Sequence, residues 1–489
     1  MKLHNSQNPK TSPARIFQPA RLQAANHPMP SRPQHLLARR GTARALRPLV
    51  CVMALSLGLV LGGCANLNGI ETPDTNSAEL AQAGWWRDFH DPLLTELIAR
   101  AMQANPNILS AQAALQQARA LRDVKLAANR PNLTVSGGVQ RNTADGAEAS
   151  VNFRGGLDAS WELDIFGANK SAVANSEADL QAARASLRDV QLSMTAEVAL
   201  AYIQLRGLQA QLDIARRNLA SQQETLQITQ WREQAGLVTS LEVAQAQTAA
   251  AQTAAQLPAL QSSLAKTRHS LAVLTGQHPH KLDALLLANQ PIPQVAMQLA
   301  EVIPADSLRQ RADVRAAEAR ITAAMASVDA AEAARLPKFR LGGSVGLTAL
   351  TLAGFSNGAA LATQILGSVS MPLLDGGAAK AQVRAQQAVL AQTRANYQNT
   401  LLTALQEIED ALVALQHDRK RLDYLQQAAS AADNAALLAL NRYNSGLIDF
   451  QTVLQTQRTL LGAQDSLASL QADLSSGHVR LIKAMGGGW

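Results

Sequence analysis

Hydrophobic residues follow two different spacings along this chain. In two long stretches an apolar residue recurs every seven positions, and in shorter stretches apolar and polar residues alternate one by one. The seven-residue repeat is carried by Val198, Leu205, Leu212 and Leu219 and again by Leu401, Ile408, Leu415 and Leu422. A sustained repeat of this kind is typical of helices that pack side by side as coiled coils.

Both long stretches lack helix breakers. Residues 168–235 contain no proline and a single glycine, Gly207, and residues 378–445 contain neither residue type. At a rise of about 1.5 Å per residue, each stretch would be about 100 Å long as one helix. We therefore predict one long helix in each stretch, and no ordinary globular domain contains helices of this length.

The alternating stretches lie in 132–165 and 338–374 and predict two strands each. In the first, odd positions from 151 onward carry the apolar side chains of Val151, Phe153, Leu157, Ala159, Trp161, Leu163 and Ile165. An apolar face opposite a polar face is what a barrel strand between lipid and water requires. An ordinary half-buried sheet has the same pattern and remains the alternative.

The two halves of the chain are copies of one unit. Residues 230–238 align with residues 440–448 at a shift of 210 positions, which places Gly236 on Gly446. Each copy has the same predicted order of elements: helix, two strands, long helix, shorter helix. Because an internal repeat determines the architecture, the fold class we expect is mainly α with a small β part.

Four strands per chain cannot close a barrel wide enough to carry water. An open sheet in lipid would leave backbone donors and acceptors unpaired along its edges, at a cost of several kcal/mol each. Other subunits must therefore complete the barrel. Three copies would give a trimeric 12-stranded β-barrel continued by a long α-helical barrel.

The first 63 residues resemble a bacterial lipoprotein signal. Their nine charged residues are all Lys or Arg, and an apolar run covers 49–61. The following Leu61-Gly62-Gly63-Cys64 resembles the lipobox, in which the cysteine is lipidated and becomes the mature N-terminus. A buried cysteine behind a short core helix is the alternative.

The charge of the mature chain argues against a nucleic-acid partner. The full sequence has 44 basic and 37 acidic residues and a formal charge of +7. Without the nine cations of the signal, 35 basic residues remain, so the mature chain is close to −2. A nucleic-acid-binding domain would carry a basic patch instead.

These observations divide the chain into six segments. They are a signal peptide with an extended n-region (1–63), an N-terminal lipid-anchored segment (64–104), a first structural repeat (105–276), a proline-rich connector (277–311), a second structural repeat (312–486) and a C-terminal tail (487–489).

Three motifs resemble one family. Trp85-Trp86-Arg87-Asp88-Phe89 is similar to its opening, Trp161-Glu162-Leu163-Asp164-Ile165-Phe166-Gly167 to its strand-to-helix corner, and Gly486-Gly487-Gly488-Trp489 to its ending. In this order and around an internal duplication, they resemble the TolC-like outer-membrane efflux proteins. The branch they resemble is the NodT-type lipoproteins that serve resistance-nodulation-division pumps. The resemblance covers nearly all of the mature chain.

The resemblance implies a lipid-anchored outer-membrane channel subunit of a tripartite efflux pump that projects into the periplasm. It would export small molecules through a trimeric tunnel gated at the periplasmic tip. Its partners would be two further copies of the chain, outer-membrane lipid, a periplasmic adaptor protein and an inner-membrane resistance-nodulation-division pump. A lipid-anchored periplasmic coiled-coil adaptor is the main alternative, although adaptors lack a duplicated unit of two strands and a long helix.

The resemblance also implies which residues form the channel entrance. The turns after the two long helices would form the periplasmic tip, with Arg232, Gly236, Arg442, Tyr443 and Gly446. Relatives commonly carry a carboxylate at the position of Gln455 and a bulky apolar group at that of Gln451. Because both are glutamine here, Asp449 and Phe450 are predicted to supply the charge and the bulk.

No catalytic arrangement is apparent in the sequence. His278 and His280 flank Pro279 in the connector, without metal-ligand partners at useful spacing. We expect a surface loop there, and neither a metal site nor a cofactor. A channel, and not an enzyme, is therefore the function that the sequence predicts.

Overall fold

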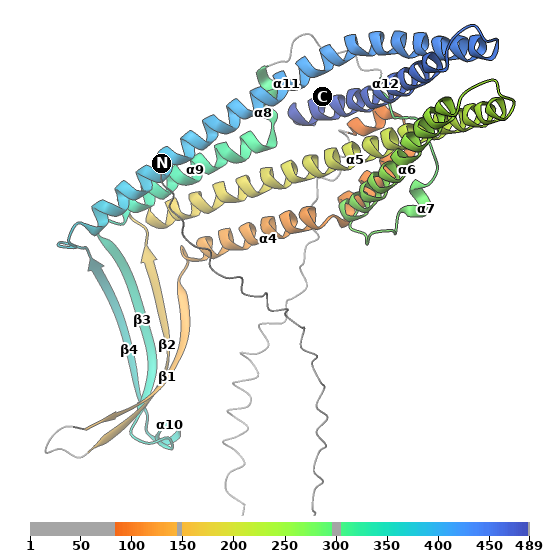
Figure 1. Ribbon diagram of the computed structural model, residues 1–489. Coiled ribbons are helices and arrows are strands. Elements are labelled where there is room, and N and C mark those ends of the chain that lie inside the picture. The colour runs from red at the N-terminus through yellow and green to blue at the C-terminus, as the bar shows by residue number, and fades with distance from the viewer. Residues whose placement is uncertain (1–83, 144–148, 296–304, 488–489) are drawn as a thin grey trace, which may run out of the picture. The chain divides into compact units, whose positions relative to one another are not determined.

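The computed structural model describes residues 84–143, 149–295 and 305–487, all of which belong to one unit, Asn76–Trp489. The signal segment and Cys64 lie outside the described residues. The described chain is mainly helical with one four-stranded sheet (Figure 1), so the fold class predicted from the sequence is confirmed.

Both copies of the repeat contain the same main elements in the same order. The first copy consists of α4 (Pro106–Ala127), β1 (Asn132–Asn142), β2 (Ser150–Leu163), α5 (Ala168–Gln234) and α6 (Ser240–Leu274). The second consists of α9 (Ala312–Ala333), β3 (Lys338–Ala349), β4 (Ala360–Ser370), α11 (Ala378–Asn444) and α12 (Phe450–Ala484). Equivalent helices are equally long: 22 residues in α4 and α9, 67 in α5 and α11, and 35 in α6 and α12. The smaller elements outside the copies are η1 (Trp85–Phe89), α3 (Pro92–Ala104), α7 (Asp283–Leu286) and α8 (Ala305–Gln310).

The offset between the copies changes across the sheet. Helix α9 begins 206 positions after α4 (312 against 106), whereas α11 begins 210 positions after α5 (378 against 168). The four extra residues of the second copy lie in β3 and in the β3–β4 connection, which contains the short helix α10 (Gly354–Asn357). The copies therefore differ most in how their two strands are joined.

The sheet is antiparallel, in the order β1-β2-β3-β4, and each strand lies beside its neighbour in sequence (Figure 1). Its register pairs odd positions with odd positions, as in Leu157 with Val345 and Val345 with Thr363. Odd positions of all four strands therefore share one face. Exposed large apolar residues on this odd face are Leu133, Val135, Val139, Leu157, Trp161, Leu341, Val345, Leu347, Leu361, Ile365 and Val369. The predicted alternation thus produces one apolar face, most of which the described part of the chain leaves exposed.

Both strand pairs end before the limits expected from the alternation. Strand β2 ends at Leu163 because the next residue, Asp164, turns to accept hydrogen bonds from the backbone N–H groups of Asn169 and Lys170, 3.0 and 2.7 Å away. Strand β4 ends at Ser370, two residues before Pro372, which cannot donate a ladder hydrogen bond. Both long helices begin within a few residues of these breaks.

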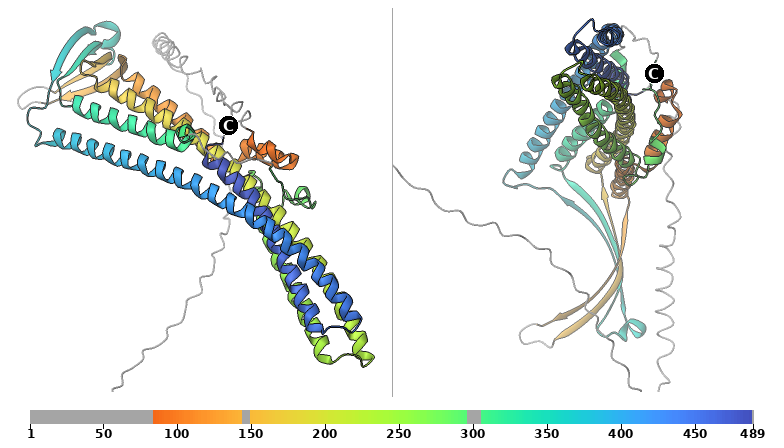
Figure 2. Two further views of the ribbon diagram at one scale, coloured as in Figure 1. Left: turned by 90° about the horizontal axis from the view of Figure 1, so that it is seen from above. Right: turned by 45° about the vertical axis from the view of Figure 1, so that its right-hand side comes forward.

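The long helices bury most of the predicted seven-residue stripes, and Leu219, Leu401 and Leu422 are half-buried. Val198, Leu205 and Leu212 of α5 are buried, as are Ile408 and Leu415 of α11. Helix α5 packs against α4, α6, α9 and α12, and α11 packs against α9 and α12. The pairing of α11 with α12 can be followed in Figure 2. None of the helices in the described ranges is long and apolar enough to cross a membrane.

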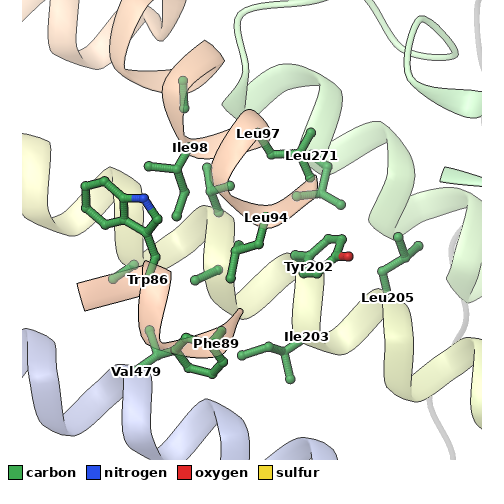
Figure 3. Close-up of a cluster of buried hydrophobic side chains, with 14 of the residues drawn as sticks. Trp86, Phe89, Leu94, Leu97, Ile98, Tyr202, Ile203, Leu205, Leu271 and Val479 are labelled. Carbon is green, nitrogen blue, oxygen red and sulfur yellow. The ribbon is translucent and has the colours of Figure 1, made fainter. Parts of the chain in front are cut away.

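The largest hydrophobic core forms where η1 and α3 meet α5, α6 and α12. Figure 3 shows Phe89 and Leu94 facing Tyr202 and Ile203 of α5, with Val479 of α12 close by. Asp91 caps α3 by accepting hydrogen bonds from two backbone N–H groups, of Leu93 at 2.9 Å and of Leu94 at 3.0 Å. The Trp85–Phe89 motif is therefore a packing element that holds the N-terminal segment on the long helix.

A polar network lies beside this core. The guanidinium of Arg206 is completely buried and donates hydrogen bonds to the Tyr202 hydroxyl (2.9 Å), to Gln209 Oε1 (2.6 Å) and to the carbonyl of Ala288 (2.7 Å). The Tyr202 hydroxyl donates in turn to Asp91 Oδ2 at 2.6 Å. The network connects α3 and the connector to α5, which explains how a buried cation is tolerated.

A second polar cluster joins α5, α9, α11 and α12. The Arg311 guanidinium donates to Asp313 at 2.7 Å, to Glu407 at 2.8 Å and to the carbonyl of Ala484 at 2.5 Å. Asp189 of α5 is half-buried near this group, and burial, together with the negative charge of Asp313, raises the pKa of the Asp189 carboxyl. The cluster therefore contains one carboxylate whose ionised form is disfavoured.

Candidate functional site

The turns after α5 and α11 have the same backbone structure. Gly236 and Gly446 adopt φ angles of 71° and 73°, a left-handed conformation that favours glycine. In each turn the next residue donates its N–H to a carbonyl five residues back, from Leu237 to Arg232 at 2.8 Å and from Leu447 to Arg442 at 2.9 Å. This is the Schellman arrangement that ends a helix. The equivalent glycines of the repeat therefore make equivalent hairpin tips.

Side chains of both hairpins meet at Tyr443. The Arg232 guanidinium lies 4.5 Å from the centroid of the Tyr443 ring, and Arg232 Nη1 donates to the Tyr443 carbonyl at 3.3 Å. The Tyr443 hydroxyl donates to Glu242 Oε2 of α6 at 3.1 Å. Burial, and then the hydrogen bond to Glu242, raise the pKa of Tyr443. Arg232, Glu242 and Tyr443, here called the tip cluster, thus connect α5, α6 and α11.

Phe450 supports the tip cluster from α12. Its ring centroid lies 5.2 Å from that of Tyr443, and its side chain is only 3% exposed. It belongs to a small core with Ala246 and Val453. In this structure the Phe450 ring is enclosed by α6, α11 and α12 of its own chain and is not presented at the exposed tip, where the sequence predicts that it narrows the entrance.

The other expected entrance residues are exposed. Asp449 is the N-cap of α12, where its carboxylate accepts hydrogen bonds from the Thr452 hydroxyl at 2.6 Å and the Thr452 N–H at 2.8 Å. These bonds hold the pKa of Asp449 below its ordinary value, so the group stays ionised. Gln451 and Gln455 are exposed four residues apart, on one face of the helix.

Arg458 extends this face and was missed by the sequence reasoning. It is exposed, three positions after Gln455 and seven after Gln451, so it lies one turn further along the same side of α12. The spacing alone could have revealed it. The face therefore carries a positive charge beyond the two glutamines, in addition to the negative charge of Asp449.

Large apolar side chains are exposed around both tip turns. Trp231, Leu237, Leu241 and Leu447 are each between 58% and 72% exposed. Arg442, the equivalent of Arg232, is exposed as well. Clustered exposed apolar residues with polar neighbours are characteristic of protein interaction sites. In the sequence, this surface is indicated by large apolar residues on either side of a glycine that ends a helix.

Of the two connector histidines, His280 makes a small exposed contact with His269 of α6 and with Asp283. His280 Nδ1 lies 3.3 Å from His269 Nε2 and 3.0 Å from Asp283 Oδ2. Within the described ranges, no group of three or more histidine, cysteine, aspartate or glutamate side chains is arranged to hold a metal ion.

Comparisons with known proteins agree with this architecture. The family model described as outer membrane efflux protein matches residues 97–277 and 303–487. The pyoverdine export outer membrane protein OpmQ of Pseudomonas putida is 33% identical, over 90% of this chain and 97% of its own length. Nodulation protein T of Rhizobium leguminosarum bv. viciae is 30% identical, over 85% of this chain and 86% of its own length.

Solved structures show the same fold. The outer-membrane channel OprN superimposes with a TM-score of 0.78 and 34% identity, covering 83% of this chain and 92% of that chain. The outer membrane protein VceC of Vibrio cholerae has a TM-score of 0.76 and 28% identity, covering 83% and 99%. With both repeats matched by the family model, the chain belongs to the outer membrane efflux protein family.

Proposed function

We propose that this chain is one of three identical subunits of an outer-membrane channel, through which a tripartite efflux pump exports small molecules. The observation that carries the proposal is the open sheet. Strands β1 and β4 each pair with only one neighbour within the described chain, and the odd face is apolar and exposed. Unpaired strand edges are not stable in lipid, so the edges must pair with those of other subunits.

Three chains would supply twelve strands, with β1 of one subunit beside β4 of the next. The odd face would then contact lipid, and the even face, with Asp158 and Glu162, would line a water-filled lumen. Helices α5 and α11, at about 1.5 Å per residue, would extend this lumen by about 100 Å into the periplasm.

The tip turns would lie furthest from the membrane and form the periplasmic gate. The contacts of the tip cluster would hold the hairpins together in the closed state. Exposed Leu237 and Leu447, with Trp231, would provide an apolar surface for the periplasmic adaptor, which joins the channel to an inner-membrane resistance-nodulation-division pump. The chain would act by providing a path and not as an enzyme.

The mass of the detergent-extracted complex tests the proposal. Three copies of the chain are expected. A monomer or dimer that still conducts ions in planar bilayers would contradict the claim that three chains are needed to close the barrel. Mass spectrometry should also find a lipid on Cys64. Cys64→Ser should remove it and slow assembly, while leaving some trimer, because the barrel itself remains in the membrane. An unmodified Cys64 in the wild-type protein would rule out the lipid anchor.

A further inference from the structure

The β3–β4 connection folds onto one particular face of the sheet. A Cβ placed on Gly155 of β2 would lie 3.6 Å from the ring of Phe355 in α10, and one on Gly354 would lie 3.0 Å from the Cβ of Ala349. Gly155 and Ala349 both occupy odd positions of their strands, and Ala349 is buried. Helix α10 therefore packs on the apolar odd face, on the side opposite to Asp158 and Glu162.

The composition of this connection differs from that of its counterpart in the first copy. No Asp, Glu, Lys or Arg occurs from Leu341 to Leu374, whereas the β1–β2 region contains Arg141, Asp145 and Glu148. Leu350 and Leu352, just before α10, are 69% and 71% exposed. Two exposed leucines beside a half-buried phenylalanine are unfavourable in water, so they indicate that the segment is not simply a solvated turn.

The topology places the β3–β4 connection at the end of the sheet that is far from the long helices. Strands β2 and β4 run directly into the long helices α5 and α11, so the β3–β4 connection lies at the opposite strand ends (Figure 1). In the proposed channel, on which this inference rests, those ends reach the outer leaflet of the membrane. The odd face that α10 covers is the face that contacts lipid.

We propose that residues 350–359 form an interfacial segment that lies in the outer leaflet, with Leu350 and Leu352 inserted at the boundary between headgroups and acyl chains. The hydrocarbon of the lipid is the partner. The segment has no basic residue that could attract anionic headgroups, so burial of apolar surface alone must hold it there. The β3–β4 connection would thus anchor the barrel in the lipid around it.

Spin labels on introduced cysteines test this proposal, since Cys51 and Cys64 are the only cysteines of the sequence. Leu352→Cys would be labelled with a nitroxide in the full-length protein, reconstituted in phosphatidylcholine vesicles. Val345→Cys, on the odd face, and Ser344→Cys, on the even face, are the matched controls, and wild-type protein gives the labelling background. Collisions with oxygen report lipid, and collisions with a water-soluble nickel chelate report water.

At Leu352 the label should collide more with oxygen than with the chelate, at a depth of about 5–10 Å into the boundary between headgroups and acyl chains. The depth of the Leu352 label should not change with salt. Phe355→Ala should move the label towards water, because it releases α10 from the sheet. If the Val345 label is in lipid but the Leu352 label is in water, or if salt detaches it, the interfacial segment is refuted and the channel proposal stands. If the Val345 label itself is in water, the proposed lipid face fails, and this inference fails with it.

Discussion

The guanidinium of Arg232 lies 4.5 Å from the centroid of the Tyr443 ring, and the two residues come from different copies of the repeat. They are not equivalent positions, because the shift of 210 places Arg232 on Arg442 and Glu233 on Tyr443. Their contact is therefore made once per chain, and it breaks the internal symmetry at the tip. If this single contact between the hairpins is lost, one hairpin can move relative to the other.

Tyr443→Phe should favour the open channel. It removes the hydroxyl that donates to Glu242 and keeps the ring that contacts Arg232 and Phe450. Loss of one hydrogen bond worth about 0.5–1.5 kcal/mol would shift the closed-to-open equilibrium about two- to twelvefold. Open probability of single channels in planar bilayers measures this. Arg442→Ala, at the exposed equivalent of Arg232, should leave the open probability unchanged, and a larger effect there would place the gate elsewhere.

Asp449→Asn should lower the cation preference of the reconstituted channel. Asparagine is also a good N-cap, so the substitution removes the charge while α12 keeps its first turn. Three carboxylates around one axis favour cations, although salt screens the effect beyond about 8 Å at physiological ionic strength. Gln455→Asp should raise the preference. If Asp449→Asn changes nothing and Gln455→Asp alone shifts the reversal potential, the lumen is lined one helical turn further along α12.

Trp161→Asp should reduce the yield of trimer more than Asp158→Ser does. Trp161 lies on the apolar odd face, whereas Asp158 lies on the even face and accepts a hydrogen bond from Ser136 at 2.5 Å. A basic residue facing the bilayer midplane costs about 2–4 kcal/mol, and an acidic one less. Native gel electrophoresis of membrane extracts measures the yield. Equal yields for the two variants would mean that the faces have been assigned the wrong way round.

Asp189→Asn should stabilise the protein at neutral pH. Burial raises the pKa of Asp189 in the folded state, so the ionised carboxylate destabilises the fold above that pKa. On acidification Asp189 takes up its proton in the folded state before it does so in the unfolded state. The destabilisation by the ionised carboxylate therefore disappears between the raised pKa and the ordinary value of 3.8. The gain in Tm should therefore be largest near neutral pH and vanish in acid. Asp213→Asn, which removes an exposed pair with Arg217, should change Tm little. A gain that persists in acid would contradict the role of ionisation.

The elements of the fold could be predicted because their signals are local. The long helices, expected over 168–235 and 378–445, were visible as stretches without breakers, and the structure has them over Ala168–Gln234 and Ala378–Asn444. Alternation likewise marked the sheet and its apolar face, since side chains of a strand point to its two sides in turn.

The buried side chains of the site could not be predicted, because long-range contacts decide them. Phe450 is enclosed only once Tyr443 of α11 and Ala246 of α6 pack against it. Arg206 has the sequence context of any surface arginine, yet it is buried because Tyr202, Gln209 and the carbonyl of Ala288 surround it. No periodicity distinguishes such residues from solvated ones.

The placement of charge on the sheet has a consequence for what moves through it. On the even face, Arg154, Asp158 and Glu162 of β2 and Lys338 and Arg340 of β3 are charged, whereas the even positions of β1 and β4 are not. In the proposed trimer the two outer strands of each subunit meet those of its neighbours, so every seam between subunits would be electrically neutral. The charged strands β2 and β3 of the three subunits would form three separate strips along the wall of the lumen. A charged solute would move along one of these strips, and an uncharged solute could use the seams between them.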